Sequence, residues 1–159
     1  TDTGESLAKR VILAEYQLYP RMFADYVGRH NRADWLLEQV SARAMALPEV
    51  EARESHGAPG WRTGGKSGKF FAYLSEFHHG EPHIGLLVKT SGQDELLSLV
   101  EQAPDTYYKP AYYGASGWVG IILNRPDVDW AHIEQWLERS WASVAPKRLT
   151  KLHNIADQF

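Results

Sequence analysis

The early part of the chain alternates apolar and polar residues with the period of a helix. Residues 34–46 repeat apolar positions every three or four residues, and Asp34 suits the positive end of the helix dipole. Leu47-Pro48 follows, and the proline disfavours helical geometry at Leu47. The sequence therefore predicts a helix over 34–46 whose inward residues are Leu36, Leu37, Val40 and Ala44.

The first thirty residues have a weaker helical pattern that is broken in the middle. Apolar residues recur at helical spacing over 5–19, Pro20 interrupts them, and a second short helical piece ends near Gly28. We interpret residues 1–30 as a helical arm added to the domain that follows, and arms of this kind pack on the domain or on a second copy of it.

After Pro48 the pattern changes to that of strands. Aromatic and β-branched residues gather in short runs bounded by glycine, which is typical of strands. Gly64, Gly65 and Gly68 predict a tight connection between two of these runs, and residues 77–82 predict a hairpin loop. The predicted strands cover residues 51–56, 61–63, 70–74, 83–89 and 118–123.

A second helix is predicted to begin at Ser91, with Asp94 completing a shortened capping box, and to end at Ala103-Pro104. Its expected apolar face consists of Leu96, Leu97 and Val100. A loop over residues 105–117 follows and carries four tyrosines. Thirteen residues without a clear period are more than a plain connection needs.

The last long helix is predicted to begin after Asp129, whose carboxylate suits the N-cap position, and to end before Pro146. Val128 and Ile133 are spaced as a hydrophobic staple. The expected buried stripe consists of Ile133, Trp136, Leu137, Ser140, Trp141 and Val144. Residues 147–159 then form a basic tail with a final turn of helix.

The order of these elements predicts an α+β fold, because strands joined by hairpins form antiparallel sheets that helices cover on one face. We expect a two-layer domain over residues 31–159, with an antiparallel sheet of about five strands packed against helices. Such a chain of 159 residues, with 43% hydrophobic residues, is long enough for one core. No apolar run approaches a membrane span and there is no cysteine, so we expect a soluble cytoplasmic protein without disulfides.

Charge is uneven along the sequence. The net charge of −3 argues against a protein that coats DNA by bulk electrostatics. Two stretches nevertheless hold basic residues and no acid, residues 55–75 and residues 139–156. They carry Arg62, Lys66 and Lys69 in the first, and Arg139, Lys147, Arg148 and Lys151 in the second. These stretches either meet on one face or belong to an evenly solvated surface.

Residues 60–67 match the phosphate-loop pattern G-x-x-x-x-G-K-[ST] letter for letter. That pattern binds nucleotides when a buried strand precedes it and a helix starts at its Lys-Ser. Here His56-Gly57-Ala58-Pro59 precedes it and a β-prone aromatic segment follows. We therefore predict a glycine-rich turn between strands and no nucleotide cofactor.

Two other clusters contain residue types used in catalysis. His78, His79, Glu81 and His83 could ligate a metal, but they lie in a hairpin loop without regular support. Ser55 and His56 are neighbours that would face opposite ways in a strand, so they cannot form a catalytic hydrogen-bond chain. We expect no metal site and no enzymatic activity.

Several short motifs occur in the order found in one family. They are Leu47-Pro48-Glu49-Val50-Glu51, His56-Gly57-Ala58-Pro59, Trp61-Arg62, Gly64-Gly65-Lys66, Phe71-Ala72, Leu87-Val88-Lys89, Pro110-Ala111-Tyr112-Tyr113-Gly114, Gly117-Trp118-Val119, Val128-Asp129-Trp130 and Ala145-Pro146-Lys147-Arg148-Leu149. With these motifs the chain resembles the MmcQ/YjbR proteins over about residues 34–149. The resemblance implies a compact α+β domain whose hairpins form a double-wing DNA-binding arrangement. Ser67-Gly68 looks inserted beside the Gly-Gly-Lys turn, and the arm over 1–30 looks added.

Our leading expectation is a non-enzymatic DNA-binding protein with little base specificity, because Lys and Gly at turns contact phosphates rather than bases. The expected phosphate contacts are Arg62, Lys66, Lys69, Lys147, Arg148 and Lys151. One alternative is a resistance or stress protein that binds a small aromatic ligand in a pocket formed by Trp61, Tyr112, Tyr113 and Trp118. Another alternative is an interaction module that forms a homodimer through the N-terminal arm.

Overall fold

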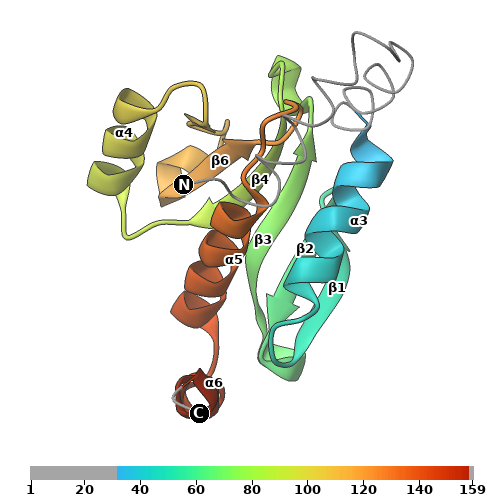
Figure 1. Ribbon diagram of the computed structural model, residues 1–159, viewed down its shortest axis with the longest axis vertical. Coiled ribbons are helices and arrows are strands. Elements are labelled where there is room, and N and C mark those ends of the chain that lie inside the picture. The colour runs from blue at the N-terminus through green and yellow to red at the C-terminus, as the bar shows by residue number, and fades with distance from the viewer. Residues whose placement is uncertain (1–31, 158–159) are drawn as a thin grey trace, which may run out of the picture.

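The computed structural model describes residues 32–157. The predicted arm over residues 1–30, and the homodimer expected from it, lie outside the described residues. The predicted α+β architecture is confirmed, since one antiparallel sheet packs against helices (Figure 1).

The sheet has six strands in the order β1-β2-β3-β4-β6-β5, and every neighbouring pair is antiparallel. The strands are β1 (Val50–Ser55), β2 (Ala58–Thr63), β3 (Lys69–Glu76), β4 (Ile84–Lys89), β5 (Tyr107–Tyr108) and β6 (Trp118–Ile122). The sequence predicted about five strands. It missed β5, because two residues at a sheet edge are too few to show a period.

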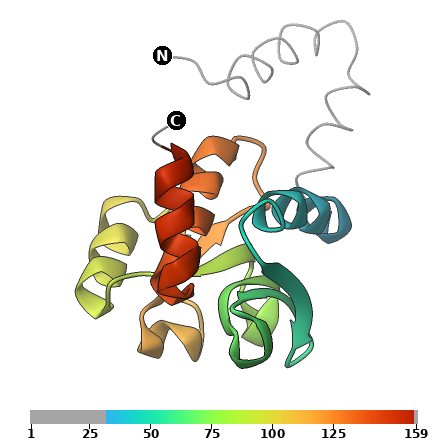
Figure 2. The same ribbon diagram turned by 90° about the horizontal axis from the view of Figure 1, so that it is seen from below.

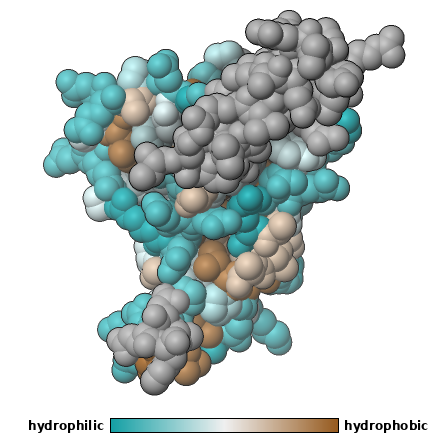
Figure 3. Space-filling view, in the orientation of Figure 1, coloured by the Kyte–Doolittle hydropathy of each residue, from teal (hydrophilic) through white to brown (hydrophobic). Residues whose placement is uncertain are grey.

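Helices α3 (Ala33–Ala44) and α5 (Trp130–Val144) cover one face of the sheet, which we call the helix face (Figures 1 and 2). The outer surface of the described residues on this side is mainly hydrophilic (Figure 3). Helix α4 (Gln93–Gln102) connects β4 to β5, and α6 (Lys147–Asp157) follows α5. The opposite face, which we call the open face, carries the loop with the 3-10 turn η3 (Tyr113–Ser116). Apolar side chains from α3, α5 and the helix face of the sheet form the core.

Strand register decides which residues lie on each face. Trp61, Ala72, Val88 and Val119 lie in one row across β2, β3, β4 and β6 and belong to the helix face. The neighbouring row of Tyr73, Leu87, Gly120 and Tyr108 therefore belongs to the open face, because successive side chains of a strand alternate between faces.

The pairing of β2 with β3 contains a bulge. Trp61 pairs with Ala72 and Arg62 with Phe70, so Phe71 is an extra residue with no partner on β2. Helix α5 compensates at this point. The Ser140 hydroxyl donates to the Phe71 carbonyl at 2.5 Å and accepts from the Lys89 amide at 3.0 Å.

The capping of α5 is confirmed. The Asp129 carboxylate accepts from the amides of Ala131 and His132 at 3.1 and 3.3 Å. All of the predicted stripe is buried except Val144, which packs against the core from a partly buried position.

Two predictions for α4 were wrong. Its N-cap is Gly92, and Glu95 rather than Asp94 reaches back, accepting from the Ser91 amide at 2.9 Å. Leu97 is 53% exposed, because Leu96 takes the inward position. The tail after Pro146 was also underestimated, since α6 has 11 residues instead of a final turn.

Candidate nucleic-acid interface

The β2–β3 hairpin tip lies beside the start of α6. The tip comprises Gly64, the 3-10 turn η1 (Gly65–Ser67) and Gly68. A Cβ atom on Gly64 would lie 3.6 Å from the ring of Pro146, so segments about eighty residues apart in sequence lie side by side here. Figure 1 shows both at the lower end of the molecule.

This approach brings four lysines of the predicted site to one end of the molecule. Lys66 lies within the hairpin tip, Lys69 follows the tip as the first residue of β3, and Lys147 and Lys151 lie on the first turns of α6. All four are exposed, and none forms an ion pair with another residue of the described range 32–157. We call these four residues the basic end.

The two arginines of the predicted site have acidic partners. Arg62 is only 18% exposed, and its Nε lies 3.0 Å from Oε2 of Glu51. Arg53 contacts the other carboxylate oxygen of Glu51, Oε1, at 2.7 Å. Arg148 contacts Glu49 at 2.7 Å. Hydrogen bonds from Arg53 and then from Arg62 hold the pKa of Glu51 below its ordinary value. Neither arginine is a free cation, unlike the lysines.

The hairpin, the helix α5 and the entry to β1 are tied together at one carbonyl. The Pro48 oxygen accepts a hydrogen bond from the Thr63 hydroxyl and another from Nε1 of Trp141, both at 3.1 Å. Thr63 is buried at the end of β2 and Trp141 is buried in α5. The base of the hairpin is therefore fixed to the core, while its tip remains exposed.

The segment with the phosphate-loop pattern is a strand, a short turn and a second strand. Gly60 and Trp61 lie within β2, and η1 leads directly into β3. No helix begins at Lys66-Ser67, so the dipole that would hold a nucleotide phosphate is missing from this part of the described chain.

The open face carries a cluster of half-buried aromatic rings. Tyr73 is its centre, with ring centroids 5.0 Å from Phe70 in a stacked geometry and 5.2 Å from both Tyr113 and Trp118. We call these four residues the aromatic cluster. Burial and then the neighbouring Tyr113 raise the pKa of Tyr73, so its phenol is neutral near pH 7.

Comparison with known proteins supports the family suggested by the sequence motifs. The YjbR family model matches residues 45–143, which is more than half of the chain. The chain belongs to the YjbR family.

A solved YjbR-like structure shares the fold. The crystal structure of Deinococcus radiodurans protein DR2400, which carries the domain DUF419, superposes with a TM-score of 0.53. The match covers 71% of this chain and 78% of that chain at 15% identity, so it supports the fold alone. No curated protein matches the sequence. Lys66 and Lys69 lie inside the part matched by the YjbR family model, whereas Lys147 and Lys151 lie beyond it.

The sheet divides the aromatic residues predicted to form one ligand pocket. Trp61 is on the helix face, 1% exposed, whereas Tyr113 and Trp118 belong to the open face. Tyr112 is 77% exposed and its ring lies near His79 instead. The predicted pocket of four residues is therefore not one site. Alternation along the strands separates its members, and one sequence does not show which residues pair.

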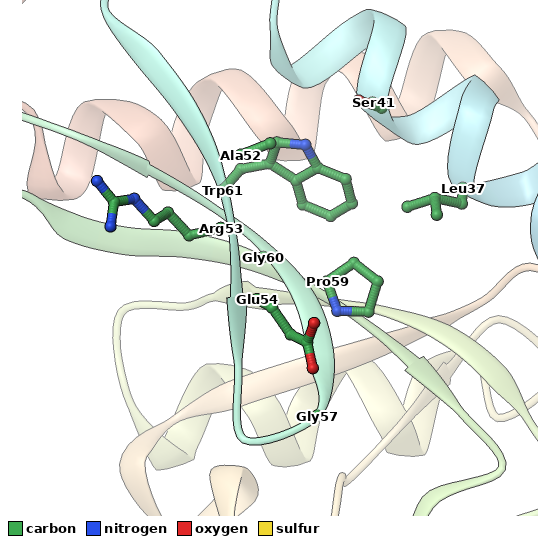
Figure 4. A pocket seen from close by; sticks show the side chains of 9 residues that line it. All are labelled: Leu37, Ser41, Ala52, Arg53, Glu54, Gly57, Pro59, Gly60 and Trp61. Atoms are coloured by element: carbon green, nitrogen blue, oxygen red, sulfur yellow. The ribbon is translucent and has the colours of Figure 1, made fainter.

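Trp61 lines a different pocket, between α3 and the β1–β2 hairpin. Figure 4 shows Leu37 and Pro59 beside its indole ring. The cavity has a volume of about 450 Å³ and is bordered by Arg53 and Glu54. It is mainly apolar, and the buried indole N–H of Trp61 has no hydrogen-bond partner among the described residues.

Three residues of the open face were not predicted from the sequence to belong to a site. Phe70 and Tyr73 were assigned only to a strand, and Lys89 only to a strand end. The Lys89 ammonium lies 5.9 Å from the centroid of the Trp118 ring, its neighbour across β4 and β6. The bulge at Phe71 places Phe70 and Tyr73 on one face although they are three residues apart, so alternation alone could not reveal them.

The histidine-rich hairpin has other contacts. His83 packs on Tyr108 with ring centroids 4.6 Å apart, and Glu81 accepts from the Ala111 amide at 2.7 Å. Within residues 32–157 no three His, Cys, Asp or Glu side chains are arranged to hold a metal ion. In the same range no helix is both long and apolar enough to cross a membrane.

Proposed function

We propose that this YjbR-family protein is a non-enzymatic DNA-binding protein of the cytoplasm whose basic end contacts the phosphate backbone. The observation that supports the proposal is the close approach of the hairpin tip at Gly64 to Pro146, the residue that precedes α6 and its lysines. Four exposed lysines, with no acidic partner among residues 32–157, form a local positive patch on a protein of net charge −3.

The chemistry of the patch favours backbone contacts over base recognition. Lysine ammonium groups are point charges on flexible stems, which suit phosphates and carry little sequence information. The hairpin tip otherwise offers glycine and one serine. We therefore expect binding that depends on salt and varies little with DNA sequence.

The number of free cations sets the expected salt dependence. Six phosphate contacts would give a slope of log affinity against log salt of about −5, whereas four give about −3.6. Arg62 and Arg148 are engaged by Glu51 and Glu49. The smaller slope is thus the expected result for the protein in this conformation.

Fluorescence anisotropy of a labelled duplex, measured over a series of salt concentrations, tests this proposal. We expect Lys66→Glu to weaken binding by about tenfold or more and to reduce the magnitude of the slope by about 1. Lys109→Glu is the matched control, because Lys109 is exposed on the loop before η3 and the change in net charge is the same.

Absence of duplex binding at low salt would contradict DNA binding as a whole. Equal losses in Lys66→Glu and Lys109→Glu would show that net charge, and not the basic end, governs binding. In that case the assigned site would be wrong.

Binding of a small aromatic ligand is the second candidate. The mainly apolar cavity beside Trp61 supports this candidate, because its volume of about 450 Å³ is usual for ligand sites. Trp61 itself is almost fully covered, however, so the cavity offers a ligand little of the indole surface. This limited contact ranks the ligand proposal below DNA binding.

A further inference from the structure

The open face of the sheet is unusual in composition. When one face of an antiparallel sheet is not covered by helices, polar residues normally occupy it. Here the aromatic cluster occupies its centre, and each of the four rings is partly exposed. Side chains of this kind present flat apolar surface to whatever approaches from solvent.

Positive charge surrounds these rings. By strand register, the open-face positions of the six strands carry three cations, Arg53, Arg62 and Lys89, and one acid, Glu51. Glu51 is already occupied by the two arginines, whereas Lys89 forms no ion pair within residues 32–157. The open face is therefore complementary to an anion that also carries flat rings.

The open face is continuous with the basic end. Strand β3 begins at Lys69, beside the hairpin tip, and Phe70 and Tyr73 of the same strand lie on the open face. Lys69 pairs with Thr63 and so belongs by register to the helix face, but it is exposed at the very end of the strand. Across the sheet, Trp118 and Lys89 are paired neighbours. A chain that crosses the open face from β3 to β6 thus starts beside the hairpin tip, passes the aromatic rings and ends near Lys89.

We propose that the open face binds single-stranded DNA, with bases stacked on the aromatic cluster and phosphates held by Lys89 and the basic end. This rests on the proposed DNA-binding function and defines its substrate. Bases of a duplex are stacked inside the helix and cannot reach the rings, whereas unpaired bases can stack on them. Aromatic residues on an open sheet can stack two or three bases in this way.

The test compares a labelled oligothymidine with a labelled duplex of equal length by fluorescence anisotropy at low salt. We expect the wild-type protein to bind the single strand more tightly. Trp118→Leu and Tyr73→Leu should each weaken single-strand binding by roughly 5- to 100-fold, with little effect on the duplex, since each removes a stacking surface.

Trp118→Phe is the rescue variant, because phenylalanine keeps a ring at this position. We expect it to retain most single-strand affinity and to lose the tryptophan quenching that oligothymidine produces. Trp35→Phe is the matched control. Trp35 is partly exposed on α3 and packs against Trp130, so quenching should persist in this variant. Thermal unfolding of each variant identifies any that fail to fold.

The outcomes separate this inference from the proposed function. One outcome would overturn the inference and leave the proposed function intact. In it, the protein binds the duplex more tightly than the single strand, and Lys66→Glu still weakens duplex binding. Folded Trp118→Leu and Tyr73→Leu proteins with unchanged single-strand affinity would also overturn it. If neither nucleic acid binds, both proposals fail.

Discussion

Gly120 and Gly85 are glycines because the ring of Tyr108 crosses the open face above them. A Cβ atom at either position would overlap the Tyr108 side chain. Tyr108 is buried there, and this burial, with the Glu81 charge as a second cause, raises the pKa of its phenol. The requirement for glycine comes from a close approach of side chain to backbone, and not from an unusual φ angle.

Gly120→Ala should therefore destabilise the protein by about 1–3 kcal/mol, because the added methyl group overpacks the space below Tyr108. Urea unfolding measures the free energy. In a Tyr108→Ala background the same substitution should cost less than about 1 kcal/mol, since the obstructing ring is gone. An equal cost in both backgrounds would show that Tyr108 is not the obstacle.

At the scale of elements, α5 and the sheet are joined at the bulge between β2 and β3. A bulge leaves backbone groups without ladder partners, and buried groups of this kind are costly unless another donor or acceptor reaches them. Ser140 provides both, because its hydroxyl donates to Phe71 and accepts from Lys89. A polar residue in the buried stripe of α5 is thus explained by the strand irregularity opposite it.

Ser140→Ala should lower the free energy of unfolding by about 2–4 kcal/mol, since two backbone groups lose their side-chain partner. Ser143→Ala is the control on the same helix. The Ser143 hydroxyl is exposed and donates within α5 to the Ser140 carbonyl, so we expect a change within about 0.5 kcal/mol. Chemical denaturation compares the two. Similar small changes in both would contradict the role assigned to Ser140.

On the scale of the whole molecule, charge is segregated although the net charge is small and negative. The hairpin tip and α6 gather exposed lysines, and the open face adds Lys89. Glu49 lies beside this end and pairs with Arg148. The pair is exposed on both sides, so it contributes little to stability, but it removes one cation from those available to a phosphate.

Glu49→Gln should increase duplex affinity by a few fold and the magnitude of the salt slope by up to about 1, because Arg148 becomes free to contact a phosphate. Glu101→Gln makes the same change in net charge at an exposed position of α4, outside the basic end, and should have a smaller effect. Anisotropy titrations over a salt series measure both. Equal gains would show that net charge alone is responsible.

Local sequence patterns predicted the elements whose determinants lie within a few residues. Asp129 was identified as the cap of α5, and the glycines of the hairpin tip were placed correctly between strands. The predictions were wrong where a residue or strand distant in sequence determines the local structure. Leu97 has the right spacing for an inward residue of α4, yet it is exposed, whereas Leu96 is buried and Leu99 and Val100 pack against the core. β5 forms only because β6 lies beside it.

The sequence predicted which types of residue form the candidate site, but not how these residues are arranged in space. The sequence indicated two basic stretches and several aromatic residues, since charge and ring content are local properties. It could not indicate that Arg62 and Arg148 are paired with glutamates, which lie elsewhere in the chain. Nor could it indicate that Trp61 and Trp118 lie on opposite faces of one sheet.

By itself, the sequence determined the α+β class, most helix and strand positions and the family, because periodicity, caps, turn glycines and motif order are properties of neighbouring residues. The tertiary structure decided the rest. The approach of Gly64 to Pro146, the bulge at Phe71 and the aromatic cluster all depend on residues distant in sequence. Such contacts depend on strand register and on helix packing, which no single segment encodes.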